Sequence, residues 1–399
     1  MTAIPRYRPH RGPAVLSAGF RPFFLGSALW SALAIPIWLV CFGGESTLPT
    51  SLCPAIWHVH EMVFGFGAAT VAGFLLTAIP NWTGRMPLQG APLACLVLLW
   101  LVGRAGVLMS ARIGPEAAAL LDLAFPLAFL NVVGREIAAG RNWRNLPMVA
   151  ALALLLLANL LVHLEPVGIA ATADLGSRLG IATLLMLISM VGGRIIPSFT
   201  RNWLTKQRPE IPSPAVFDRF DRVVLAATAL ALVLWVLAPD GFLTPWAALA
   251  SGLAQASRLA RWRGSATLRE PSVAKMQDPH QRLALGFLLL ALNGVATLLP
   301  QTAALHALTA GAIGTMTLAV MTRASLGHTG RTLVAGPGTT TIYVLVTIAA
   351  ALRVAAPLAA EHYLAVLWLA GAAWSGAFGL FVFLYARPLM LPREAAGPV

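Results

Sequence analysis

Apolar stretches of about 20 residues recur along the whole chain, and short polar segments separate them. A stretch of this length can cross the hydrocarbon core of a bilayer as one helix. The pattern predicts twelve membrane-spanning helices, over residues 23–43, 57–79, 91–110, 115–134, 147–164, 178–196, 222–239, 244–260, 282–300, 302–323, 340–357 and 361–386. The expected fold class is an all-α polytopic membrane protein, with residues 1–399 as a single transmembrane domain.

Composition agrees with this pattern, and the distribution of charge adds a topology. Of the residues, 58% are hydrophobic and only 11% are charged, against roughly 25% charged in a soluble domain. The net charge of +13 at pH 7 would suit a nucleic-acid partner, but most basic residues lie in the segments that a cytoplasmic N-terminus places inside. The predicted outer loops are short and carry several acidic residues instead. The positive-inside rule therefore explains the charge, predicts that both termini are cytoplasmic, and excludes nucleic acid.

Three predicted spans end in similar sequences, which suggests an internal repeat. These ends read "AIPNWTGR", "IIPSFTRN" and "VMTRASLGHTGR", at a spacing of about 120 residues. Similarity at a fixed period is typical of repeated units, and would give three four-helix units at 20–140, 141–260 and 261–399. The alternative is that Pro, Thr and Arg commonly close the inner ends of spans.

The eight histidines fall into two groups by predicted depth. Near the outer side lie His58, His60, His163, His306 and His362; near the inner side lie His10, His280 and His328. His306 and His328 are separated by about 33 Å if the span between them is helical, so they cannot share one metal ion. The outer group is therefore the candidate metal site.

Neutral imidazole is a common ligand for haem iron, copper and zinc. His58, His60 and His306 start two spans rich in small residues, which would let a flat macrocycle lie between the helices. The alternative is close helix packing without a cofactor. On an α-helix His58 and Glu61 share a face, while His60 points nearly the opposite way. We therefore expect a haem between these spans, with axial ligands from His306 and from His58 or His60, and with Glu61 orienting His58.

The remaining polar residues have plainer interpretations. His163 and His362 are expected to be solvated interface residues, and His10 and His280 surface residues. Arg104 and Asp122, in adjacent apolar spans, are expected to form a buried structural pair. The segment "LGHTGR" after Arg323 would bind an anionic group such as a haem propionate, or would form an ordered inner turn.

Five strings carry a resemblance to a known family: "FRPFF" (20–24), "WHVHEMVFGF" (57–66), "GFLLTAIPNWTGR" (73–85), "GRIIPSFT" (193–200) and "ALHALTAGAIGTMTLAVMTRASLGHTGR" (304–331). They resemble the NnrS family of multi-pass bacterial inner-membrane proteins, and the long last motif is highly specific. The resemblance implies haem and copper as cofactors, and a link to nitric oxide and nitrosative stress.

The resemblance also implies a set of site residues. Its motif histidines correspond to His58, His60, His306 and His328, with Glu61, Arg194 and Arg323 as companions. The chain departs from the family in "RLALGF" (282–287), where many members have a histidine and Ala284 is the nearest residue here. A copper ligand set that includes that histidine is therefore not carried over.

A weaker likeness is to haem-copper oxidases and nitric oxide reductases, whose core also has three four-helix pseudo-repeats. Their ligands lie on helices 2, 6, 7 and 10, and the predicted spans 2 and 10 match that layout, whereas spans 6 and 7 carry no histidine. The copper triad of those enzymes is therefore missing, and the likeness concerns the fold alone.

These observations and the resemblance favour a haem-bearing membrane protein, with or without copper, that binds, senses or reduces nitric oxide. If it is an enzyme, it would be an oxidoreductase of the nitric oxide reductase type, with a membrane or periplasmic electron donor. The alternatives are a transporter or permease, and a structural or assembly protein without redox chemistry. A permease predicts polar groups through the midplane of the bilayer, and this sequence concentrates them at the span ends.

Overall fold

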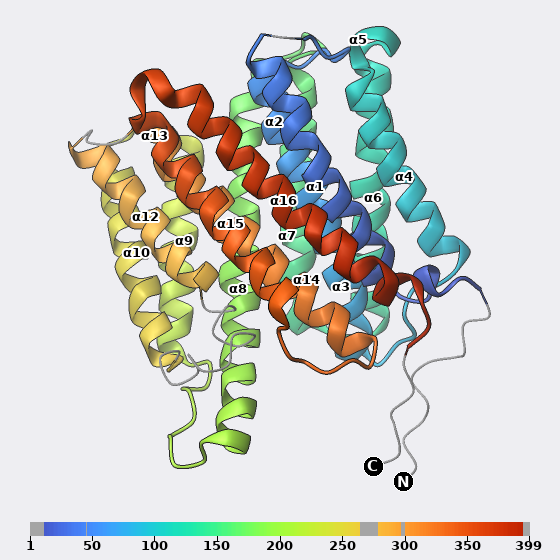
Figure 1. Cartoon of the computed structure of the whole chain (residues 1–399), viewed down its shortest axis with the longest axis vertical. Helices are drawn as coiled ribbons and strands as arrows, with labels where there is room; N and C mark the ends of the chain where they lie inside the picture. The colour runs from blue at the N-terminus through green and yellow to red at the C-terminus, as the bar shows by residue number, and fades with distance from the viewer. Residues whose placement is uncertain (1–11, 45, 264–277, 297–299, 394–399) are drawn as a thin grey trace. The chain divides into compact units, whose positions relative to one another are not determined.

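The computed structural model describes residues 12–44, 46–263, 278–296 and 300–393 (Figure 1). Over these residues the backbone is helical, with short connections and no strand. The chain divides into two compact units. Unit 1 comprises Met1–Gly180, Met321–Thr332 and Phe378–Val399, and unit 2 comprises Ile181–Val320 and Leu333–Ala377.

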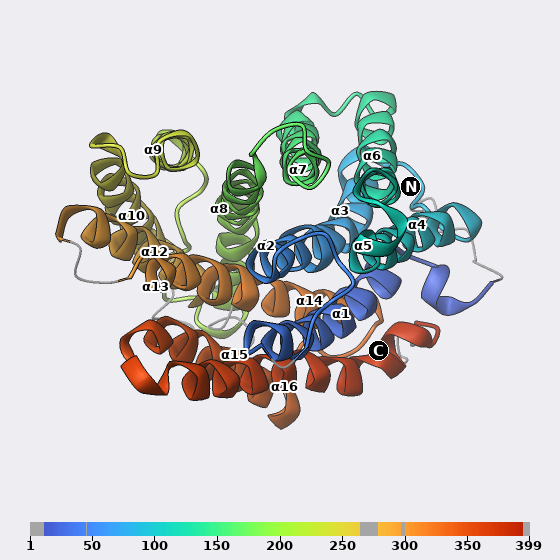
Figure 2. The same ribbon diagram turned by 90° about the horizontal axis from the view of Figure 1, so that it is seen from above.

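Unit 1 is built on seven helices from the first part of the chain: α1 (Phe20–Phe42), α2 (Pro54–His60), α3 (Ala68–Thr83), α4 (Ala91–Leu108), α5 (Ser110–Ile113), α6 (Pro115–Ala139) and α7 (Leu146–Leu164). Within it α1 packs against α3, and α6 packs against both α4 and α7 (Figure 2). Proline occupies the first turn of α2, α4, α6 and α7, where its missing N–H costs nothing. The sequence therefore marks the starts of these helices clearly.

Unit 2 contains α9 (Arg219–Leu237), α10 (Leu243–Arg261), α12 (Asp278–Ala296), α13 (Gln301–His306) and α15 (Pro337–Ala355). Here α10 packs against α9 and α12. Three further helices pass from one unit to the other along the chain: α8 (Ala173–Gln207), α14 (Thr315–His328) and α16 (Tyr363–Met390).

Each of the twelve predicted spans falls on a helix, and the all-helical membrane class is confirmed. Among the described residues, ten helices are long and apolar enough to cross a bilayer. Two predicted spans, on α10 and α12, are not among these ten because they carry more polar residues. The end of the predicted span 282–300 also lies partly outside the residues described. The count of twelve therefore stays a prediction.

The helix α8 is longer than predicted. Its 35 residues extend about 52 Å, beyond the roughly 30 Å of a hydrocarbon core. The apolar pattern of residues 178–196 ends where the helix would leave the bilayer, but the helix continues through Pro197 to Gln207. The apolar pattern shows where a helix leaves the bilayer, but it does not show where the helix itself ends. The predicted span therefore stops before α8 does.

Two of the apolar spans, Pro54–Thr83 and Gln301–His328, share an unexpected backbone feature. In the first, α2 ends at His60 and a π-helix follows over Glu61–Gly67. In the second, α13 ends at His306 and a π-helix follows over Ala307–Gly314. π-Helices are rare and often mark functional sites. Equivalent members of a repeat would share this pattern, although the threefold repeat itself stays a prediction.

The membrane crossing of α10 can be tested with single cysteines in a background without the native thiols. If α10 crosses, Asp240→Cys, before it, and Arg263→Cys, after it, lie on opposite sides; both positions are exposed. We expect a membrane-impermeant maleimide to label only Asp240→Cys from the periplasm. Labelling of Arg263→Cys from the same side would show that α10 does not cross.

Candidate metal centre

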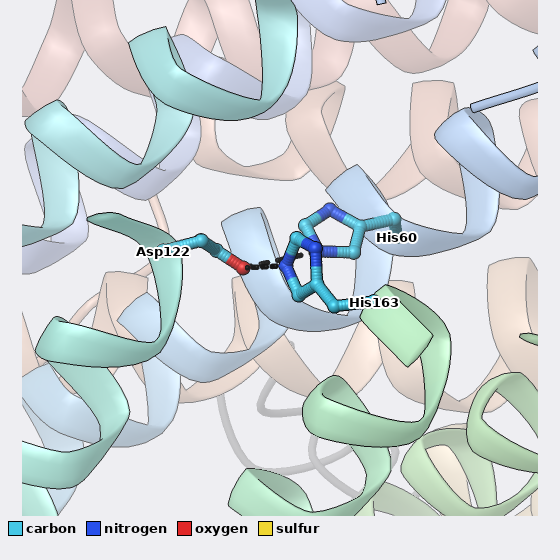
Figure 3. A group of neighbouring side chains, drawn as sticks. All are labelled: His60, Asp122 and His163. Carbon is cyan, nitrogen blue, oxygen red and sulfur yellow. Dashed lines mark hydrogen bonds and ion pairs between the residues drawn. The ribbon is translucent and has the colours of Figure 1, made fainter. Parts of the chain in front are cut away.

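Three helices of unit 1 bring polar side chains together near their ends. His60 is the last residue of α2, Asp122 lies near the start of α6, and Asn159 and His163 lie near the end of α7. All four side chains are buried, with His60 completely inaccessible. Figure 3 shows the Asp122 carboxylate pointing at the imidazole rings of His60 and His163.

The distances within this cluster are those of direct contacts. Asp122 Oδ2 lies 3.1 Å from His60 Nε2 and 2.9 Å from His163 Nε2. Asn159 donates from Nδ2 to the same oxygen at 2.8 Å, and its Oδ1 lies 2.9 Å from His60 Nε2. One ligand atom from each of His60, Asp122 and His163 lies within 4.8 Å of the others. Two imidazole nitrogens and a carboxylate oxygen therefore converge on one small volume.

Glu61 fixes the orientation of His60. Its Oε1 lies 2.9 Å from His60 Nδ1, so that nitrogen carries a proton that it donates to the carboxylate. The other oxygen, Oε2, accepts from Arg104 Nη1 and from Trp30 Nε1, each at 2.7 Å. A carboxylate on Nδ1 directs the opposite ring nitrogen, Nε2, toward Asp122.

Arg104 joins the two carboxylates. Its Nη1 donates to Glu61, and its Nη2 forms an ion pair with Asp122 Oδ1. All three side chains are at most 4% exposed, so the pairs lie in a low-dielectric interior. The expectation of a buried Arg104–Asp122 pair is thus confirmed, and Glu61 extends it into a chain from His60 to Asp122.

Two glycines make room for these contacts. A Cβ atom at Gly65 would lie 2.7 Å from Glu61 Oε2 and 2.8 Å from Trp30 Nε1. A Cβ atom at Gly103 would lie 2.8 Å from Asp122 Oδ1. Any side chain at either position would displace a member of the cluster.

Other sequence-predicted residues lie elsewhere. His58 is half-buried, and its ring stacks on that of Trp38 with centroids 4.2 Å apart. Glu61 contacts His60 and not His58, so the expectation that it orients His58 is wrong. The π-helix begins at Glu61 and turns less per residue than an α-helix, which brings the Glu61 carboxylate to its neighbour's ring.

The remaining members of the predicted set are spread over both units. His306, at the end of α13, and Arg194, in α8, belong to unit 2, whereas Arg323 and His328 belong to unit 1. The ring of His328 lies against Phe20, with centroids 5.4 Å apart.

Two expectations about histidines are corrected. His163 is buried in the cluster and not solvated, because α7 packs against α6 and the His163 ring contacts Asp122 of α6. His280 is buried against the ring of Trp262 and is not a surface residue. His362 is exposed, as expected, and His10 lies outside the described residues. Asn159 was overlooked, although Asn159 and His163 are four residues apart in an apolar helix and so share one face.

The cluster suits a single transition-metal ion. Two histidines and one carboxylate form a ligand set typical of non-haem iron, and imidazole also suits copper and zinc. It does not suit a haem, because a macrocycle cannot enter between side chains already in hydrogen-bond contact and fully enclosed.

The role of Gly65 can be tested by Gly65→Ala. We expect the added methyl group to push Glu61 and Trp30 apart and to destabilise the protein by about 1–3 kcal/mol. Gly134→Ala, in α6, is the control: a Cβ there meets nothing within 4 Å, and removing a helical glycine stabilises by up to about 1 kcal/mol. Thermal unfolding in detergent measures both. Equal midpoints for the two variants would contradict this account of the cluster.

The comparisons with known proteins agree with the architecture. The sequence model of the NnrS family, described as "NnrS protein", matches residues 14–393. No curated protein matches the chain significantly. The match includes all the residues of the His60–Asp122–His163 cluster and nearly the whole helical structure. The chain therefore belongs to the NnrS protein family.

Proposed function

We propose that this protein is a membrane metalloprotein that binds nitric oxide, with a metal ion held by His60, Asp122 and His163. The observation that carries the proposal is the convergence of these three ligand atoms within 4.8 Å in a buried site. Membership of the NnrS family fits a membrane protein linked to nitric oxide. Binding is common to storage, sensing and reduction of the gas, so the proposal applies to all three.

The surrounding residues support a redox metal more than an inert structural ion. A set of two histidines and one carboxylate leaves coordination positions for a small molecule, as in non-haem iron sites. When bound, an iron or copper ion would supply the affinity for nitric oxide. Glu61 would hold the Nδ1 proton of His60, so that Nε2 faces the ion, and Arg104 would hold Asp122 through its other oxygen.

Burial suits this ligand. Nitric oxide is small and uncharged, so it can partition into a bilayer and reach a site among helices without a polar channel. The cluster lies near the ends of three helices that count among the candidate spans, close to the depth at which the sequence predicts the outer surface. The same enclosure would keep bulk water away from the site.

Haem, which the family resemblance implies, is a separate part of the proposal. His306 donates from Nδ1 to the Thr302 carbonyl at 2.7 Å, which places the metal-binding lone pair on Nε2. The second axial ligand that the sequence suggests, His58 or His60, stays a prediction. Arg194, Arg323 and His328 stay candidates for haem propionates or a further metal. Copper stays a candidate for the His60–Asp122–His163 centre.

Matched variants separate the two cofactors. The purified protein would be analysed for metal content by mass spectrometry and for haem by its Soret band. We expect His163→Ala to lower the affinity for the non-haem metal by at least about tenfold and to leave the Soret band unchanged. His306→Ala should lose haem and keep the non-haem metal. His362→Ala, at an exposed histidine, should change neither.

Nitric oxide binding would be followed on the same samples by electron paramagnetic resonance. The nitrosyl signal of the non-haem metal should change in His163→Ala, because one imidazole no longer reaches the metal. If His163→Ala retains its metal content and an unaltered nitrosyl signal, the centre is not at this cluster. If His306→Ala keeps its full haem content and spectrum, the haem assignment is wrong and His328 is the next ligand to test.

A further inference from the structure

A cleft of about 520 Å³ opens at the end of unit 1 where α3 and α6 finish. Its accessible apolar lining includes the half-buried Pro80 of α3 and Val132 of α6 and the exposed Met86, above the buried Ile79. The chain leaves α3 through Gly84, at a φ of 71°, and residues 85–88 then line the opposite side. The ends of the two helices approach closely beside it, because a Cβ atom at Gly140 would lie 2.6 Å from Thr83 Cβ.

The mouth of this cleft carries an excess of positive charge. Arg85 pairs through Nε with Glu136 Oε2, and Arg135 Nη2 lies 3.3 Å from Glu136 Oε1. Two guanidinium groups thus share one carboxylate. The two Nη groups of Arg85 have no partner in the part of the chain that is described, and the arginine side chains are 44% and 66% exposed. These donors are available to an anion with several acceptor oxygens.

The cleft lies at the depth of a membrane surface. Both α3 and α6 are parts of candidate membrane-spanning helices and end here, at Thr83 and Ala139. Trp82 lies one residue before the end of α3, and its carbonyl accepts from Asn142 Nδ2. Trp143, at the start of the next candidate span, is 61% exposed. Tryptophans in such positions mark the headgroup region of a bilayer.

The cleft has an apolar wall and a basic mouth, and it lies at the depth of the membrane surface. These three features suit a ligand with an apolar chain and an anionic headgroup. We propose that this cleft binds an anionic phospholipid, with the phosphate at Arg85 and Arg135 and the start of an acyl chain along Pro80, Met86 and Val132. A free phosphate ion would use the arginines but not the wall. A zwitterionic lipid would use the wall but would bring a cation to the arginines. Basic pockets between membrane helices are typical binding sites for anionic headgroups.

Native mass spectrometry of the intact protein, released from micelles with equal phosphatidylglycerol and phosphatidylcholine, would test this proposal. The wild type should retain phosphatidylglycerol preferentially. Replacing Arg85 and Arg135 together by glutamine should lower this retention by at least about tenfold, since two favourable charges are lost. The control is Arg112→Gln, at an exposed arginine of α5, which should leave it unchanged.

Glu136→Gln gives the sharper result, because it removes the one negative charge at the mouth and keeps the shape of the side chain. We expect retention of phosphatidylglycerol to rise about fivefold. A fall would indicate a ligand that uses Glu136 as an acceptor, such as a quinol, and would overturn the proposal. Displacement of the lipid by millimolar inorganic phosphate would show a simple anion site and would overturn it as well.

Discussion

The interaction on which the candidate centre depends is the double ion pair of Arg104 with Glu61 and Asp122. Arg104 comes from α4, Asp122 from α6 and Glu61 from the π-helix after α2, so one guanidinium ties three segments together. Removing one partner of a buried pair leaves an uncompensated charge and costs about 3–5 kcal/mol. The pairing leaves Glu61 Oε1 and Asp122 Oδ2 for the histidines. The charges therefore hold the candidate ligand atoms in place without a bound ion.

The backbone of residues Glu61–Gly67 leaves the space that these ion pairs need. The π-helix at Glu61–Gly67 sets Glu61 beside His60, and Gly65 leaves the space that the Glu61, Trp30 and Arg104 side chains fill. The Gly65 carbonyl also accepts from Trp100 Nε1 at 2.9 Å, which fastens α4 to the same turn. A π-helix follows His306 in the same way as one follows His60. This parallel favours an equivalent role for the two spans, one contributing to the metal centre and the other to the proposed haem.

Much of the fold could be predicted from the sequence, because apolar length alone determines where helices cross a bilayer. The pair of Arg104 and Asp122 could also be predicted, since two opposite charges in adjacent apolar spans have few other partners. The full site could not. The depth of a residue in the membrane follows from its position in the span. The direction of its side chain depends on how the helix is rotated about its own axis, and a π-helix changes that rotation. For this reason the sequence predicts that Glu61 contacts His58 and that His163 is solvated, whereas Glu61 contacts His60 and His163 is buried.

X-ray absorption at the edge of the bound metal tests the central claim most directly. The account predicts a first shell of nitrogen and oxygen donors only, with the outer-shell scattering of two imidazoles, and loss of one imidazole in His163→Ala. His58→Ala should leave the non-haem metal spectrum unchanged. A shell that contains sulfur, or an imidazole contribution unaffected by His163→Ala, would contradict the assignment of the centre to His60, Asp122 and His163.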